Sequence, residues 1–193
     1  MNHQPAPMTD SRVTVTPLPW RYSRTAVVLH WAVAFALAVM AGLGWFMMSI
    51  EDEPGSGLYF ELHKSFGIVL AVLIVARVAW RITHRPEPLP ASVPIWQARL
   101  AQAVQVMLYA LTALMVLTGY LGAAYSKAGV KLFGLATPRW ALPDHARAEQ
   151  WFGIHSVLIW VLVAAVAIHV LGALKHLLVD RDGTFRRMWS GRR

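Results

Sequence analysis

Four histidines occur in or at the edges of long apolar stretches of this sequence: His30, His63, His155 and His169. Ionisable side chains inside such stretches are costly to bury and usually have a partner. The stretches contain no Asp or Glu that could be that partner. Neutral imidazole is, however, a common ligand of haem iron and of other transition metals. One such histidine alone would be interpreted as a hydrogen-bonded structural residue, whereas four of them require a common explanation.

The sequence contains no cysteine. This excludes disulfides, thiolate metal sites and a cysteine nucleophile. It also excludes the CxxCH motif through which c-type haem is attached covalently. A haem held by these histidines would therefore be of the b type.

Four apolar stretches must position these side chains. Crossing the roughly 30 Å hydrocarbon core of a bilayer takes about 20 helical residues. Three stretches contain no charged residue over that length: Thr25–Ile50, Leu100–Ser126 and Gln150–Leu174. The charge-free part of the remaining stretch, Ser65–Ala76, is shorter, and it reaches full length if its flanking cations extend to the headgroups. With 56% hydrophobic and 15% charged residues, the chain is predicted to be an all-α, integral membrane four-helix bundle.

The predicted helices cover residues 25–50, 58–82, 100–126 and 150–179. Between them, "EDEPGSG" and "HRPEPLPASVP" are rich in turn residues and in prolines that cannot continue a helix. We expect one transmembrane domain over residues 21–187, a mobile tail over 1–20 and a basic tail over 188–193. The first tail lacks the apolar core of a signal peptide.

The charge distribution predicts the orientation. If both termini are cytoplasmic, the inner segments hold 13 of the 18 Lys and Arg residues, as the positive-inside rule requires. We therefore expect a multi-pass protein of the bacterial inner membrane with both termini in the cytoplasm. The net charge of +8 then reflects topology and contact with lipid headgroups, and no nucleic-acid partner is expected.

Depth along the helices sorts the four histidines into two layers. At about 1.5 Å per residue, His30 lies roughly 9 Å beyond Arg24, and His169 lies roughly 9 Å before Lys175. Both belong to the inner layer. His63 and His155 follow soon after acidic residues of the outer segments and belong to the outer layer. Each layer thus contains one histidine from each of two helices.

Helical phase brings the two layers onto one side of the last helix. The fourteen residues from His155 to His169 correspond to about 21 Å of rise and come within about 40° of whole turns. Imidazoles that face each other across a bundle form the bis-histidine site of a b-type haem. We therefore predict two haem b groups, the inner held by His30 and His169 and the outer by His63 and His155.

Other residues could complete the two sites. Four cations at suitable depths are candidate partners of haem propionates, although headgroup contact explains them equally well: Arg24, Lys64, Arg77 and Arg81. Glycines could admit a macrocycle or merely allow close helix packing: Gly42, Gly44, Gly67, Gly119, Gly122, Gly153 and Gly172.

The remaining histidines are not expected to bind haem. His176 is too shallow to match His30, so we expect an interface residue or a spare proton carrier. His3, His84 and His145 are expected in tails or loops without a specific role. Gln102 and Gln105 of the third helix are given no role.

Several segments together resemble the bacterial cytochrome b561 family of four-helix dihaem membrane proteins. They are "RYSRTAVVLHW", "LHKSFG", "ARVAWR", "LYALTALMVLTGYLG", "GIHSVLIWVLVAAVAIH" and "DGTFRRM", and the resemblance covers about Arg21 to Arg187. It implies the same four haem ligands and an oxidoreductase that exchanges electrons with the quinone pool, with ubiquinone as substrate.

Some members of that family are superoxide oxidases, so the resemblance also makes superoxide a candidate donor. A basic outer rim could steer this anion or could simply solubilise a loop: Lys64, Lys127, Lys131, Arg139 and Arg147. A second hypothesis is a haem-bearing membrane anchor that carries electrons for a separate dehydrogenase or hydrogenase. A transporter of protons or metal ions is disfavoured, because the histidines form two layers without intramembrane carboxylates.

Overall fold

Four long helices dominate the computed structural model, which describes residues 21–86 and 93–189. They are α1 (Arg24–Ser49), α2 (Gly57–Thr83), α3 (Ile95–Tyr125) and α4 (His145–Lys175). A π-helical turn, η1 (His176–Asp180), continues α4, and the short helix α5 (Arg186–Trp189) follows it. Between α3 and α4 lies a small antiparallel hairpin of β1 (Lys131–Leu132) and β2 (Leu135–Ala136).

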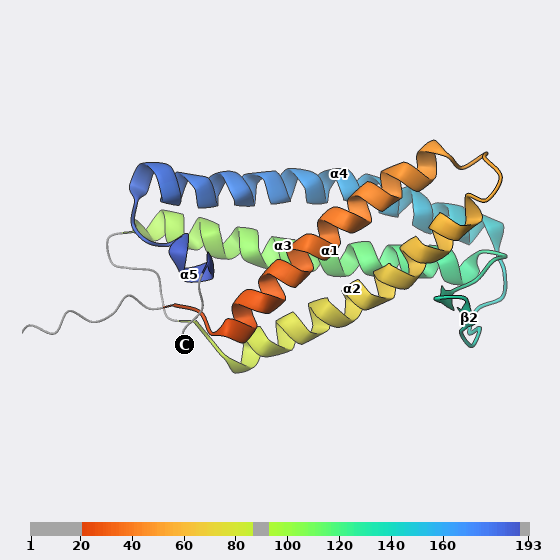
Figure 1. Ribbon diagram of the computed structural model, residues 1–193, viewed down its shortest axis with the longest axis horizontal. Helices are drawn as coiled ribbons and strands as arrows, with labels where there is room; N and C mark the ends of the chain where they lie inside the picture. Colours follow the sequence, from red (N-terminus) through yellow and green to blue (C-terminus); the bar gives the residue numbers. More distant parts are fainter. Residues whose placement is uncertain (1–20, 87–92, 190–193) are drawn as a thin grey trace, which may run out of the picture.

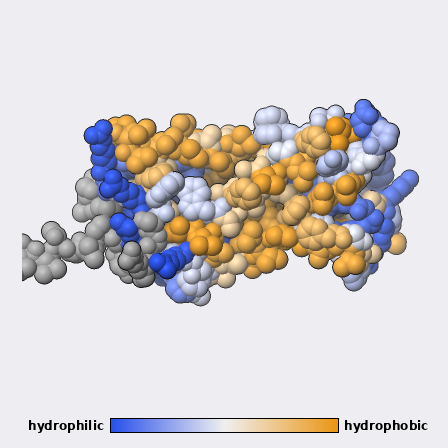
Figure 2. Space-filling view, viewed as in Figure 1, coloured by the Kyte–Doolittle hydropathy of each residue, from blue (hydrophilic) through white to orange (hydrophobic). Residues whose placement is uncertain are grey.

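All four long helices have the length and composition of membrane spans. Large apolar side chains point outward from them; Phe35 of α1 is 73% exposed and Trp160 of α4 is 64% exposed. Figure 2 shows the apolar surface as a band between two hydrophilic ends. The prediction of an all-α protein with four apolar helices is confirmed.

Two helices begin earlier than the apolar stretches suggested. α3 begins at Ile95, directly after Pro94, and α4 begins at His145. The Asp144 carboxylate caps α4 by accepting a hydrogen bond from the backbone N–H of Arg147 (3.1 Å). Hydropathy marks the lipid-facing part of a helix, whereas proline and N-cap residues determine the residue at which the helix begins.

Two histidines expected in loops belong instead to helix ends. His145 is the first residue of α4, and His84 is the C-cap of α2. The His84 ring stacks on Trp80 with centroids 3.8 Å apart. His3 lies outside the described residues.

Figure 1 shows two antiparallel helix pairs. α1 and α2 form one pair and α3 and α4 the other, and the first pair crosses the second obliquely. A small core of Val33, Leu70 and Ile74 lies between α1 and α2. One connection joins α1 to α2 and another joins α3 to α4. The side chains that face each other from different pairs line a space along the bundle.

We call the two ends of the bundle by their contents. The terminal end is where α1 begins and α4 ends, and the hairpin end is where β1 and β2 lie. At the terminal end α5 folds back against α1, where the Trp31 indole N–H donates to the Met188 carbonyl (3.1 Å). The rings of Trp31 and Trp189 also meet edge to face, with centroids 5.8 Å apart.

At the hairpin end one buried hydroxyl joins the hairpin to α2. Ser65 is 0% exposed. Its Oγ donates to the Glu61 carbonyl (2.8 Å) and accepts from the Phe133 backbone N–H (2.9 Å). Phe133 and Gly134, which form the turn, both have left-handed backbone angles.

Candidate functional site

The structure brings His30 of α1 and His169 of α4 together near the terminal end. Their ring centroids are 6.2 Å apart and the ring planes are inclined by 70°. His30 lies in the first turns of α1 and His169 near the end of α4, and both line the space between the helix pairs.

A second pair of rings lies toward the hairpin end. The His63 ring of α2 faces the His155 ring of α4, with centroids 6.3 Å apart and planes at 85°. These are the same two pairs that helical depth and phase select. α4 contributes one histidine to each of them.

The ring spacing suits one metal ion between the members of each pair. A metal–imidazole bond of about 2 Å, continued by about 1.1 Å to the ring centre on either side, separates two trans rings by about 6 Å. The two observed separations match this value. The residues present therefore fit bis-histidine ligation at both levels.

The hydrogen-bond partners of His155 determine which of its ring nitrogens is available to bind a metal ion. Its Nδ1 lies 3.0 Å from the Met115 carbonyl oxygen and 3.3 Å from the Thr118 hydroxyl. A carbonyl can only accept, so Nδ1 carries the proton and Nε2 keeps its lone pair. This outer hydrogen bond is the kind that orients a metal-binding histidine and makes it a better ligand.

Two of the predicted glycines lie directly against these rings. A Cβ at Gly119 would be 2.9 Å from Cε1 of His155, and a Cβ at Gly44 would be 3.2 Å from Cε1 of His63. Both glycines therefore make room for a ring. A Cβ at Gly122 would instead overlap Phe152, which is ordinary packing between α3 and α4.

The other glycines do not contact the histidines. A Cβ at Gly67 would make only van der Waals contact with Met40, and the nearby space is open at Gly42, Gly153 and Gly172. Within the outer pair, Nδ1 of His63 is buried and has no hydrogen-bond partner among the described residues.

Three of the four candidate propionate partners contact protein groups. Nη2 of Arg77 lies 3.0 Å from Nδ1 of His30. Arg81 donates to the Gln105 side-chain oxygen (3.1 Å), and Lys64 donates to the Gly129 carbonyl (3.3 Å). Arg24 is exposed at the first turn of α1.

The Arg77 contact sets the proton position on His30. A guanidinium has no acceptor, so Nδ1 of His30 must accept and the ring proton sits on Nε2. A neutral ring that binds iron through Nε2 carries its proton on Nδ1. The Arg77 contact and ligation by a neutral His30 through Nε2 are therefore alternatives.

A continuous cavity of about 2880 Å³ connects the two pairs. All four histidines line it, as do Gly44, Gly119 and Arg77. Most of its wall is aliphatic and aromatic, which is typical of a site for a large flat cofactor. His176 also lines this cavity, at its terminal end.

Some residues of this site were not identified from the sequence. The Met115 carbonyl and the Thr118 hydroxyl gave no signal, because a backbone acceptor looks the same at every residue. Gln105 was noticed, but its contact with Arg81 depends on how α2 and α3 are rotated. Only a hydroxyl directly before Gly119 on an apolar helix could have indicated Thr118.

Comparison with known proteins identifies the family. The family described as prokaryotic cytochrome b561 matches residues 21–191. "Cytochrome b561 homolog 2" of Escherichia coli K12 is 33% identical over 181 residues, which cover 91% of this chain and 95% of that protein. "Cytochrome b561 homolog 1" of the same organism is 27% identical over 180 residues, covering 90% and 99%.

A more distant relative is the "Probable Ni/Fe-hydrogenase B-type cytochrome subunit" of Rhizobium leguminosarum bv. viciae. It is 23% identical over 210 residues, covering 89% of this chain and 87% of that protein. With the family match extending over nearly the whole chain, this protein belongs to the prokaryotic cytochrome b561 family and is a membrane b-type cytochrome of electron transfer.

Proposed function

We propose that the protein is a dihaem cytochrome that carries electrons from a donor at the hairpin end to the quinone pool. His30 and His169 would hold one haem b, and His63 and His155 the other. The observation that carries this proposal is the pair of facing imidazoles at each of two levels of the bundle. Bound haem supplies a one-electron redox couple whose potential its axial ligands tune.

The chain's own residues orient and insulate the two sites. The Met115 carbonyl accepts from Nδ1 of His155, which leaves Nε2 with its lone pair, and Gly44 and Gly119 leave room for the rings. Arg77 now contacts His30. When haem is bound, Arg77 could instead pair with a haem propionate at the same level. Arg24, Lys64 and Arg81 remain candidate propionate partners.

The topology we propose places both termini in the cytoplasm of a bacterium, with residues 21–187 as one domain in the inner membrane. Of the 18 Lys and Arg residues, 13 belong to the terminal end or the segments leading from it. The positive-inside rule assigns that end to the cytoplasm. The hairpin end then faces the periplasm, where an electron donor would approach.

Superoxide is the donor to test first, by resemblance to the family. The predicted basic rim is partly neutralised, because Lys131 pairs with Glu61 and Arg147 pairs with Asp144. The hairpin end contains five Lys and Arg residues but six Asp and Glu residues. Attraction of an anion would thus depend on local charge near Lys64, and it should weaken strongly with added salt.

A second candidate function is a haem-bearing anchor for a separate dehydrogenase or hydrogenase. It is favoured by the similarity to the Rhizobium protein and to a "Probable Ni/Fe-hydrogenase B-type cytochrome subunit" of Bradyrhizobium diazoefficiens, 24% identical over 232 residues. Copurification of a stoichiometric soluble subunit would favour this candidate.

Haem content and quinone reactivity test the leading proposal. The purified chain should give two haem b per protein in a pyridine haemochrome assay. Its dithionite-reduced haem should be reoxidised by a short-chain ubiquinone analogue. A preparation with no Soret band, or reduced haem that the quinone leaves unchanged, would refute the proposal.

A further inference from the structure

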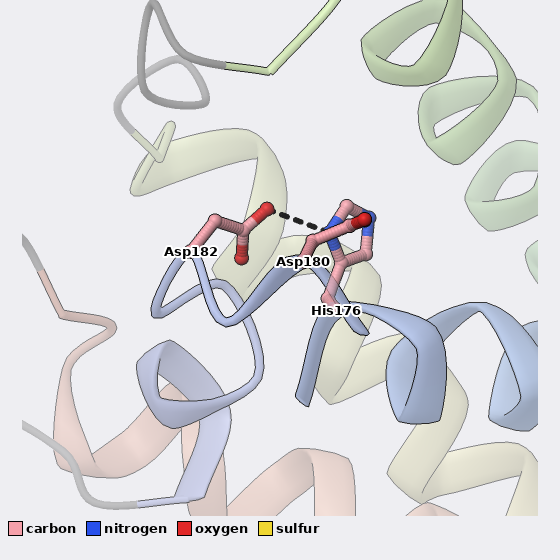
Figure 3. A group of neighbouring side chains, drawn as sticks. All are labelled: His176, Asp180 and Asp182. Carbon is pink, nitrogen blue, oxygen red and sulfur yellow. Dashed lines mark hydrogen bonds and ion pairs between the residues drawn. The ribbon is translucent and has the colours of Figure 1, made fainter. Parts of the chain in front are cut away.

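His176 lies outside both histidine pairs, in the π-helical turn that ends α4. Its side chain is only 14% exposed. Nδ1 of this ring lies 2.7 Å from a carboxylate oxygen of Asp182 and 3.3 Å from one of Asp180. Figure 3 shows the imidazole beside these two side chains, with a dashed line marking its contact with Asp182.

The charges of this cluster balance when the ring is protonated. The Lys175 ammonium pairs with Oδ2 of Asp180, the same oxygen that faces His176. Two carboxylates are then matched by one ammonium and one imidazolium. A divalent metal on these atoms would have to displace Lys175, so the arrangement favours a bound proton over a metal ion.

The second carboxylate is itself held in place. The backbone N–H of Thr184 donates to Oδ1 of Asp182 (2.9 Å), while Oδ2 faces His176. Burial acts to raise the pKa of Asp182, but the hydrogen bonds from Thr184 and His176 and the charge of His176 hold that pKa below its ordinary value. The ionised Asp182 thus accepts a hydrogen bond from Nδ1 of His176.

The ring also belongs to the cavity that contains the inner pair. His176 and His169 both line its wall at the terminal end. Because Asp182 engages Nδ1, the nitrogen left for exchange is Nε2. Other titratable or charged groups on this part of the wall are Arg81, His84, Arg85, Arg99, Lys175 and Arg187.

We infer that His176, with Asp182 as its positioning residue, delivers protons to quinone reduced at the terminal end of the bundle. This inference rests on the proposed quinone-reducing function. Each quinone would take two electrons, one at a time from a haem held by His30 and His169, and two protons to become quinol. For each proton the Nε2–H bond breaks, an O–H bond forms on a quinone oxygen, and water at the terminal end restores the proton to Nε2.

Among the neighbouring groups His176 is best suited to this task. Arginine does not give up its proton in proteins, and the Lys175 ammonium is engaged by the Asp180 carboxylate. His84 lines the same end of the cavity, but it stacks on Trp80 and is exposed. No carboxylate contact with His84 occurs within the described ranges, which makes His84 the matched control.

The test measures reoxidation of the haem-loaded, dithionite-reduced full chain by a short-chain ubiquinone analogue in stopped flow. We expect His176→Ala to slow reoxidation at least about tenfold, because positioned proton transfer typically contributes 10²- to 10⁴-fold. Added imidazole should restore part of the rate. His84→Ala should behave as the unmodified chain, and haem content and midpoint potentials should be unchanged in both variants.

Asp182→Asn gives an independent readout. This substitution removes the carboxylate oxygen that accepts from Nδ1 of His176 and holds the ring in place, so reoxidation should slow while haem content and midpoint potentials stay unchanged. If His176→Ala loses haem, His176→Gln and Asp182→Asn decide the question on the same two measurements.

The outcomes separate the inference from the function beneath it. If the unmodified chain is reoxidised and the His176 variants keep pace at every pH, proton delivery by His176 is wrong and quinone reduction stands. If quinone does not reoxidise the unmodified chain, both fail. A stoichiometric non-haem metal, present in the unmodified chain and lost in His176→Ala, would also overturn the proton role.

Discussion

Nδ1 of His155 lies 3.0 Å from the carbonyl oxygen of Met115, one helix away on α3. This contact ties the ring that α4 contributes at the hairpin end to a backbone atom that no side-chain substitution removes. In the pair near the terminal end, the Arg77 guanidinium lies against the corresponding nitrogen, Nδ1 of His30. The two histidine pairs are therefore similar in spacing but different in electrostatic surroundings.

Single removal of the α4 histidines should separate the two haems. His155→Ala should abolish the haem near the hairpin end, and His169→Ala the haem near the terminal end, since each would remove one of the two ligands that we propose for that haem. The pyridine haemochrome assay should fall from two haems per chain to one in each variant. His145→Ala, exposed at the start of α4, should keep both haems. An unchanged ratio in either site variant would contradict the pairing.

A methyl group at Gly119 should disturb one site selectively. Its Cβ would be 2.9 Å from His155, closer than real contacts allow, so the ring or the helix must shift. We expect Gly119→Ala to alter the electron paramagnetic resonance signal of the haem near the hairpin end and to reduce its occupancy. Gly42→Ala, which enters open space, should leave both signals unchanged and stabilise α1 by up to about 1 kcal/mol. Equal spectra in both variants would argue against close contact at Gly119.

Arg77 should influence the potential of the haem near the terminal end. A cation beside a redox centre favours the reduced form, so Arg77→Leu should lower that midpoint potential by some tens of millivolts. Arg77→Lys keeps the charge and should keep most of the potential while losing the fork geometry. Potentiometric titration of the two haems resolves the effect, and a shift confined to the haem near the hairpin end would contradict it.

Ser65 should anchor the β1–β2 hairpin to α2 at the hairpin end of the bundle. Ser65→Ala leaves the Phe133 N–H without its acceptor, and a hydrogen bond of this kind contributes about 0.5–1.5 kcal/mol. We expect a lower thermal unfolding temperature and faster proteolysis between β1 and β2. Ser156→Ala removes only an exposed hydroxyl that donates to its own helix and should change neither. Equal protection of the hairpin in Ser65→Ala would show that other contacts hold it.

The carboxylate of Asp182 should make stability depend on acid. Burial opposes its ionisation, but the Thr184 and His176 hydrogen bonds win and lower its pKa on folding. The folded state then binds fewer protons than the unfolded state, so the contribution is full above the ordinary carboxyl pKa and lost as pH falls through the folded value. Thermal unfolding at several acidic pH values should show this loss, and Asp182→Asn should flatten that part of the curve.

Much of this arrangement was predictable because lipid imposes simple rules. Apolar length predicted four helices, and rise per residue predicted which histidines share a level, since both follow from regular backbone geometry. The starts of α3 and α4 were misplaced, because Pro94 and Asp144 act outside the apolar stretches.

Contacts that depend on helix rotation could not be predicted. Which carbonyl meets His155, and that Arg77 meets His30, follow from how α3 and α2 turn about their axes. The β1–β2 hairpin was also missed, because strands of two residues carry no alternating pattern. His84 and His145 were assigned to loops for a related reason: helix ends near prolines resemble loops in composition.

The hydrogen bond between Trp31 and Met188 has a practical consequence for anyone who modifies this chain. Trp31 is the neighbour of His30, so this hydrogen bond attaches α5 to the turn of α1 that contains His30. Shortening the chain before Met188, or fusing a bulky reporter that pulls α5 away, would loosen that turn. Fusions intended to map the membrane topology should therefore be scored for retained haem before their signal is interpreted.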